Sequence, residues 1–93
     1  MDVTAFSVEV RDGCVMISGE IDMATAALLV DAVIKSSDAA LDLSGVTFID
    51  SMGLHALIQL RKGGTLPPIV TISAPVRRLL ELSGTTHYLG VSA

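Results

Sequence analysis

The sequence contains one cysteine, no tryptophan, and only 3% aromatic residues. The single cysteine, Cys14, excludes an intrachain disulfide and any metal site built from several thiolates. Its apolar neighbours Val15, Met16 and Ile17 favour a buried structural thiol rather than a reactive one. Because aromatic side chains are so few, we expect the core to be built from valine, isoleucine, leucine and alanine.

Positive charge is also scarce. Six lysine and arginine residues stand against ten acidic residues, which gives a net charge of -4 and an isoelectric point near 4.8. The only adjacent cations are Arg61 with Lys62 and Arg77 with Arg78. A nucleic-acid-binding surface needs clustered cations to contact phosphates, so we expect no nucleic acid partner.

Long apolar runs are missing as well. No run approaches the ~20 residues that a membrane-spanning helix requires, and the first ten residues lack the basic and apolar segments of a signal peptide. We therefore expect a cytoplasmic protein that does not bind a membrane. With 93 residues, 51% of them hydrophobic and 17% charged, the chain fits one globular domain over residues 1–93. We expect a monomer or a weak dimer.

The first third of the sequence predicts two strands and a helix. Apolar and polar residues alternate over residues 6–11, which is typical of a strand, and Asp12-Gly13 forms a hairpin turn before a second strand over 14–18. Asp22 is a suitable N-cap for a helix over residues 23–35, which residues 36–38 close.

The middle of the sequence predicts a central strand and a second helix. Residues 39–43 form the strand, Ser44-Gly45 a turn, and residues 46–49 lead towards a helix over residues 52–62. Gly63-Gly64 then ends this helix, because glycine is common at the C-terminus of helices.

The last third predicts two further strands around a third helix. A strand over residues 69–72 precedes a helix over 75–82, which begins at Pro75 and stops at Gly84, and residues 88–91 form a short last strand. Strands that alternate with helices indicate an α/β fold. We expect a single mostly parallel sheet of four to five strands, with an antiparallel N-terminal hairpin at its edge and three helices.

Ser51 is the residue of greatest chemical interest, because it lies where a strand-like segment meets the start of a helix. Serine is a favoured N-cap residue, and capping alone would explain its presence. Alternatively, its hydroxyl is presented at a helix N-terminus, where free N–H groups and the helix dipole favour an anion such as a phosphate. The sequence leaves both interpretations open.

A catalytic interpretation of Ser51 is weaker. Asp50 and either His55 or His87 would supply the other residue types of a hydrolase triad. However, DSMG lacks the two glycines of the G-x-S-x-G turn, and His55 lies only four residues further along the same helix. The chain also has no glycine-rich phosphate loop followed by lysine. We therefore expect no enzymatic activity, no metal site and no cofactor.

A polar stripe follows Ser51 along the helix. Spacings of four, four and three residues place on one helical face Ser51, His55, Gln59 and Lys62. The predicted buried face lies opposite and consists of Leu54, Leu57 and Ile58. An ordinary solvated helix face explains the stripe, but a partner that binds at Ser51 could contact it too.

Three blocks of the sequence form a recognisable pattern. Residues 19–26 read GEIDMATA, residues 42–54 read DLSGVTFIDSMGL, and residues 73–84 read SAPVRRLLELSG. In their order and spacing these blocks resemble the STAS domain, in particular the bacterial anti-sigma factor antagonists. The central block is the most specific of the three.

The resemblance implies a role in transcription regulation by partner switching. Such antagonists bind an anti-sigma factor that is also a serine kinase, which frees the sigma factor. The kinase phosphorylates the antagonist on the serine that follows the aspartate of a D-S-x-G-L motif, here Ser51, and a serine phosphatase removes the phosphate. The resemblance also implies that Asp50 adjoins the acceptor and that Asp22 lies near it at the end of the sheet.

One residue departs from the family pattern. The position after the acceptor is usually serine, threonine or alanine, whereas this sequence has Met52. The methionine would change the choice of kinase or place an apolar contact in the interface. We expect the surroundings of the phosphorylation site to include Asp22, Asp50, Met52 and Gly53. We expect the partner to contact Ser51, Met52, His55, Gln59 and Lys62.

A second kind of STAS protein remains as an alternative. Some small STAS subunits bind the cytoplasmic ATPase of a lipid-transporting ABC complex and need no phosphorylation. Those proteins often have threonine at the position of Ser51 or lack the aspartate–serine pair. The intact Asp50-Ser51 pair therefore favours the signalling role.

Overall fold

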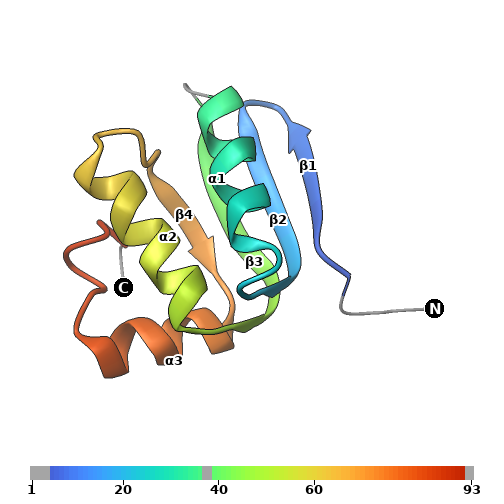
Figure 1. The fold of residues 1–93 in the computed structure, drawn as a ribbon. Helices are drawn as coiled ribbons and strands as arrows, with labels where there is room; N and C mark the ends of the chain where they lie inside the picture. Colours follow the sequence, from blue (N-terminus) through green and yellow to red (C-terminus); the bar gives the residue numbers. More distant parts are fainter. Residues whose placement is uncertain (1–4, 37–38, 92–93) are drawn as a thin grey trace.

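The computed structural model describes residues 5–36 and 39–91, which form one sheet and three helices (Figure 1). In chain order the elements are β1 (Ser7–Arg11), β2 (Cys14–Ile21), α1 (Ala26–Lys35), β3 (Ala40–Ile49), α2 (Ser51–Lys62), β4 (Ile69–Ile72) and α3 (Ala74–Ser83). The predicted α/β class, with three helices and a mostly parallel sheet, is confirmed.

The sheet has four strands in the order β1-β2-β3-β4. The hairpin of β1 and β2 is antiparallel, and the pairs β2–β3 and β3–β4 are parallel. Asp12 and Gly13 both have positive φ angles, 53° and 74°, which is the backbone conformation that a two-residue hairpin of the right twist requires. The antiparallel hairpin at the sheet edge is therefore as predicted.

One face of the sheet carries the core. The helices α1 and α2 lie side by side over this face, whereas α3 packs against β3 at the end of the sheet (Figure 1). Along β2, buried residues alternate with half-buried ones that face the other side. Cys14 belongs to the second set, so the prediction of a buried thiol is wrong: the residue is only half-buried.

The core is aliphatic, as the composition predicts. Its buried residues come from every element except β1, and none of the buried residues in the described ranges is aromatic or charged. Fully enclosing one leucine or isoleucine side chain contributes about 1.5–3 kcal/mol. The core residues are Val15, Ile17, Ile21, Leu29, Val33, Ala39, Leu41, Leu43, Val46, Ile49, Ala56, Leu57, Leu60, Ile69, Val76, Leu80 and Leu89.

The predicted turn at Ser44-Gly45 is wrong, because β3 runs without a break from Ala40 to Ile49. A Cβ atom on Gly45 would lie 2.7 Å from the Cβ atom of Ser18 in β2. The β2–β3 pairing also shifts register between Met16 and Ser18. Glycine is needed here because two backbones approach closely at an irregularity inside the sheet, which is a recognised use of glycine within strands.

The predicted last strand over residues 88–91 is also wrong. This segment forms turns closed by local hydrogen bonds: Leu89 N–H donates to Thr85 O at 2.9 Å, and Gly90 N–H donates to His87 O at 3.0 Å. The apolar character of the segment is explained by Leu89, which is buried in the core. Burial of Leu89, together with a hydrogen bond from Arg61 Nε to the carbonyl oxygen of Tyr88 at 3.0 Å, holds this part of the chain without a strand.

The start of α1 differs from the prediction. The helix begins at Ala26 with Thr25 as its N-cap, three residues later than predicted. Asp22 caps the preceding turn instead, since its carboxylate accepts hydrogen bonds from the N–H groups of Ala24 and Thr25 at 2.9 and 3.1 Å. At the other end Ser36 is the C-cap, and residues 37–38 of the predicted closing segment lie outside the described residues.

Candidate functional site

The N-terminus of α2 is capped by Asp50. Its Oδ1 atom accepts hydrogen bonds from the backbone N–H groups of Met52 at 2.9 Å and Gly53 at 3.1 Å. The extended backbone of Asp50 is typical of an N-cap residue. The capping interpretation of Ser51 is therefore wrong, because the aspartate before it takes that role and Ser51 is the first residue of the helix.

Ser51 is consequently available to other molecules. The residue is exposed, and within residues 5–36 and 39–91 its hydroxyl makes no hydrogen bond to another side chain or to the backbone. The neighbouring Met52 has 43% of its surface exposed. The start of α2 thus presents a hydroxyl group beside an apolar side chain.

The site is formed by the ends of two neighbouring strands. Ile21 at the end of β2 pairs with Ile49 at the end of β3, and the backbone N–H of Asp50 donates to the carbonyl oxygen of Ile21 at 3.2 Å. Asp22 and Asp50 therefore each follow the C-terminal end of a strand, and these two strands are adjacent and parallel. The structure brings together the two segments that carry them, although 28 positions separate the two aspartates in the sequence.

Gly53 fixes how closely α2 approaches these strand ends. A Cβ atom at this position would lie 2.7 Å from Ile21 Cγ2 and 2.8 Å from Ile49 Cγ1. Real Cβ atoms do not come so close to other carbons, so any side chain here would push the first turn of the helix away from the sheet. Gly53 therefore sets the position of Ser51 through packing.

The polar stripe on α2 is present. The four residues of the stripe are all exposed and follow one face of the helix: Ser51, His55, Gln59 and Lys62. The buried face was predicted only in part. Leu57 is fully buried, but Leu54 and Ile58 are half-buried, and the other core contacts come from Gly53, Ala56 and Leu60. A helical wheel centred on Leu57, with alanine counted as apolar, would have found Ala56 and Leu60.

The arrangement does not resemble a hydrolase site. The carboxylate of Asp50 bonds to two backbone N–H groups rather than to an imidazole. These N–H groups, on Met52 and Gly53, are consequently not available as an oxyanion hole. Neither His55 nor His87 makes a side-chain hydrogen bond to Ser51 in the part of the chain that the structure describes.

Two further features bear on binding sites. Among the described residues, no three histidine, cysteine, aspartate or glutamate side chains are grouped closely enough to hold a metal ion. In the same residues, no helix combines the length and the apolar character needed to cross a bilayer.

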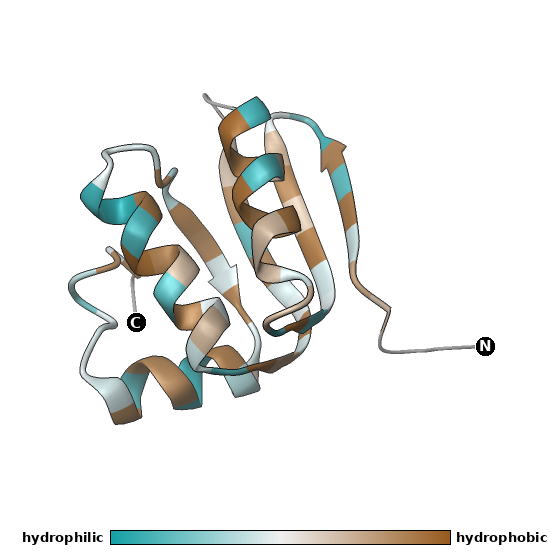
Figure 2. Cartoon of the chain, viewed as in Figure 1, coloured by the Kyte–Doolittle hydropathy of each residue, from teal (hydrophilic) through white to brown (hydrophobic). Residues whose placement is uncertain are grey.

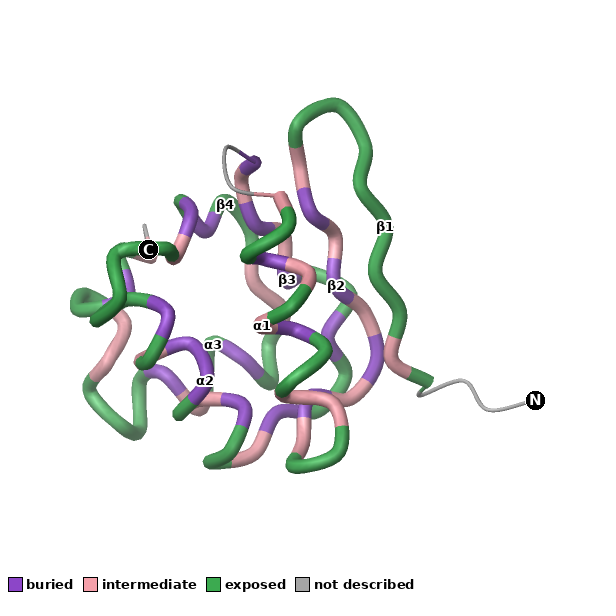
Figure 3. Tube along the Cα trace, turned by 45° about the horizontal axis from the view of Figure 1, so that its top comes forward, coloured by how far each residue is buried: buried purple, intermediate pink, exposed green. Residues whose placement is uncertain are grey.

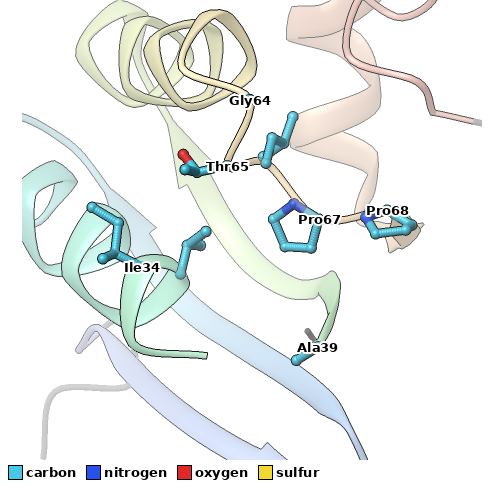
Figure 4. Close-up of a pocket in the computed structure, with 8 residues that line it drawn as sticks. Ile34, Ala39, Gly64, Thr65, Pro67 and Pro68 are labelled. Carbon is cyan, nitrogen blue, oxygen red and sulfur yellow. The ribbon is translucent and has the colours of Figure 1, made fainter. Parts of the chain in front are cut away.

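A cavity of about 430 Å³ lies between the C-terminal end of α1 and the segment that leads into β4 (Figure 4). Its walls are mostly apolar and include Val33, Ile34, Leu66, Pro67 and Pro68. Ala39 also lines it, directly before β3, whereas Ser51 follows the other end of that ten-residue strand. The cavity and the Ser51 surface are therefore separate features.

These observations define a small mixed α/β domain whose distinctive surface is an exposed serine at a helix start, above the ends of two parallel strands. A sequence model of the STAS domain matches residues 5–92. The chain belongs to the STAS domain family.

Solved structures are similar as well. An anti-sigma factor antagonist from Mycobacterium paratuberculosis shares 33% sequence identity and superimposes with a TM-score of 0.69, over 90% of this chain and 80% of that one. A candidate anti-sigma factor antagonist from Thermotoga maritima gives a TM-score of 0.64 at 23% identity, over 88% of this chain and 80% of that one, and supports the fold alone. No curated protein sequence matches the chain significantly.

Proposed function

We propose that this protein is an anti-sigma factor antagonist, which binds a serine-kinase anti-sigma factor in the cytoplasm and so releases a sigma factor. The proposal rests on Ser51, which is exposed at the start of α2. It is supported by the STAS domain and by its similarity to the mycobacterial antagonist. In this role the kinase phosphorylates Ser51, and a serine phosphatase removes the phosphate.

The partner would bind along α2. Ser51 and Met52 lie at the start of the helix, and the exposed side chains of His55, Gln59 and Lys62 continue the same surface. The polar groups would bond to the partner, and the half-exposed thioether of Met52 would supply an apolar contact that adapts to the opposing surface.

Phosphorylation would weaken this complex by adding charge to the interface. The Ser51 oxygen bonds to the γ-phosphorus of ATP as the bond from that phosphorus to ADP breaks, and the hydroxyl proton is released, so the side chain gains about -1.5 to -2 charges. The N–H groups of Met52 and Gly53, which would otherwise receive the phosphate, already bond to Asp50. A charge that is buried in an interface without a partner costs several kcal/mol, and about 2.7 kcal/mol weakens affinity a hundredfold.

The decisive experiment is affinity capture followed by phosphosite mapping. The tagged wild-type protein should retain a protein with a serine-kinase domain, and incubation of the pair with ATP should place one phosphate on Ser51. The matched control is Ser44→Ala, which removes another exposed serine on β3 and should leave the phosphorylation unchanged. Retention of an ABC-transporter ATPase, with no phosphate on Ser51, would instead support the phosphorylation-independent role.

A further inference from the structure

The strand β1 is an uncovered edge of the sheet. All five of its residues are exposed (Figure 3), and within residues 5–36 and 39–91 it pairs only with β2. On its outer side, alternate backbone N–H and C=O groups point away from the sheet, which is the template that another strand can join. Val8 and Val10 have 40% and 58% of their surface exposed.

The two valines face the side of the sheet that carries the core. Their partners across the hairpin, Ile17 and Val15, are buried beneath the helix layer, but α1 does not extend over β1. A groove of about 460 Å³ remains between α1 and β1. Its apolar wall is formed by Phe6, Val8, Val10, Leu28 and Ala32.

The other edge strand is better protected. β4 has only four residues, and Pro67-Pro68 directly precedes it. Short edge strands and prolines are common devices against unwanted strand pairing. β1 contains no proline, and its two charged residues, Glu9 and Arg11, alternate with the valines along the strand (Figure 2). Their side chains form an ion pair with each other on the face opposite the valines.

We propose that the β1 edge binds a second copy of this chain. Two β1 strands pair in antiparallel fashion about a twofold axis at Val10, which joins the two four-stranded sheets into one. In this register Glu9 of each copy lies opposite Arg11 of the other, and opposite charges on facing residues stabilise antiparallel pairs. The same contact covers the valines and closes the side of the groove that is open to solvent.

Charge favours a second copy as the occupant of this surface. The protein has a net charge of -4, so two copies repel each other over most of their surfaces. The charged side chains along this edge instead form two ion pairs: Asp31 with Lys35 beside the groove, and Glu9 with Arg11 on the other face of β1. This surface is therefore nearly neutral and complementary to itself, as the interface of a twofold dimer has to be.

The proposal is independent of the antagonist role, and both can hold together. β2 separates β1 from β3, and Ser51 follows the far end of β3. A dimer through β1 would leave the exposed face of α2 open on both copies (Figure 1).

Sedimentation equilibrium of the purified protein tests the proposal. The wild type should convert from monomer to dimer as its concentration rises into the range of about 0.1–1 mM, an interaction of roughly 4–5.5 kcal/mol. Val10→Lys should weaken the dimer at least tenfold. Val70→Lys is the matched control, because Val70 is 59% exposed on the other edge strand and should leave the dimer unchanged. A wild type that stays monomeric, or equal effects of both variants, would overturn the proposal.

Two experiments, a charge exchange and a disulfide cross-link, test the register and do not depend on how Val10→Lys folds. Glu9→Arg should weaken the dimer, because it places arginines opposite each other, and adding Arg11→Glu should restore it. In a Cys14→Ser background, Val10→Cys should form a disulfide between two copies under mild oxidation, since facing residues lie within disulfide range. The control Val70→Cys should not. Failure of the double charge exchange to restore the dimer, or equal cross-linking of both cysteine variants, would contradict the register.

Discussion

The backbone N–H of Asp50 donates a hydrogen bond to the carbonyl oxygen of Ile21 at 3.2 Å. This contact continues the parallel pairing of β2 with β3, which brings two distant sequence blocks to one surface, and it ties the start of α2 to the end of β2. On that surface the side chain of Asp50 fixes the first turn of the helix, and the residue after it remains exposed.

Replacing Ser51 with alanine should abolish phosphorylation without harming the fold. The hydroxyl is exposed and makes no cap, so the free energy of unfolding should change by no more than about 0.5 kcal/mol. Phosphate incorporation is measured by mass spectrometry after incubation with the anti-sigma factor kinase and ATP. A phosphate found at Ser44, Thr47 or Ser83 would contradict the assignment of Ser51 as the acceptor.

Replacing Ser51 with aspartate should imitate the phosphorylated state. We expect a melting temperature near that of the wild type and a loss of affinity for the anti-sigma factor of about 10- to 100-fold, or roughly 1.4–2.7 kcal/mol. Calorimetric titration and thermal unfolding measure the two quantities. The control is Ser44→Asp, which adds the same charge at an exposed position of β3. Normal binding by Ser51→Asp, or a loss caused by unfolding, would contradict the switching mechanism.

Replacing Asp50 with alanine should destabilise the domain, because two N–H groups at the start of α2 lose their acceptor. Loss of an N-cap costs about 0.5–2 kcal/mol, which lowers the melting temperature of a domain of this size by roughly 4–8 °C per kcal/mol. Asp50→Asn should retain most of the stability, since asparagine is also a good cap. Urea denaturation checks both variants, and equal stability of Asp50→Ala and wild type would show that the cap is unimportant.

Replacing Gly53 with alanine should also destabilise the domain. Alanine has a higher helix propensity than glycine by up to ~1 kcal/mol, but the added methyl group would contact Ile21 and Ile49 at 2.7–2.8 Å. Overpacking of this kind costs about 1–3 kcal/mol, so the net effect should be unfavourable. Gly63→Ala is the control: Gly63 has φ of -77° and its nearest neighbour would lie at 3.4 Å, so this variant should be neutral or stabilising. Comparable urea midpoints for the two variants would contradict the packing argument.

The sequence predicts the fold where local patterns and tertiary packing agree. The hairpin turn at Asp12-Gly13, the helix predicted over residues 52–62 and the strand over 69–72 each adjoin or contain a strong glycine or proline signal, and the structure has all three, with the helix starting one residue earlier. The start of α1 was predicted less well, because Asp22 caps a turn rather than the helix itself. Local sequence identifies a residue that can cap, but not which of several consecutive turns it caps.

The remaining errors come from contacts between distant residues. Gly45 was predicted to lie in a turn because glycine is common in turns. In the structure it lies within β3, where a side chain would collide with Ser18 on the neighbouring strand. The apolar character of residues 88–91 predicts a strand, but these residues instead pack on the core from a turn, with Leu89 buried and Val91 partly buried. At the candidate site the sequence identified the serine at the helix start but not Asp50 as the residue that caps the helix, because that role depends on the extended backbone conformation of Asp50.

The position of Ser51 within a helix determines what a kinase would have to recognise. The first turn of α2 owes its shape to Asp50 and to the packing of Gly53 on Ile21 and Ile49, so it exists only in the folded domain. A short peptide with the sequence around Ser51 would lack that shape and should be a poor substrate. Phosphorylation would then be confined to folded molecules. Chains that have not yet folded, or that have unfolded, would not be phosphorylated.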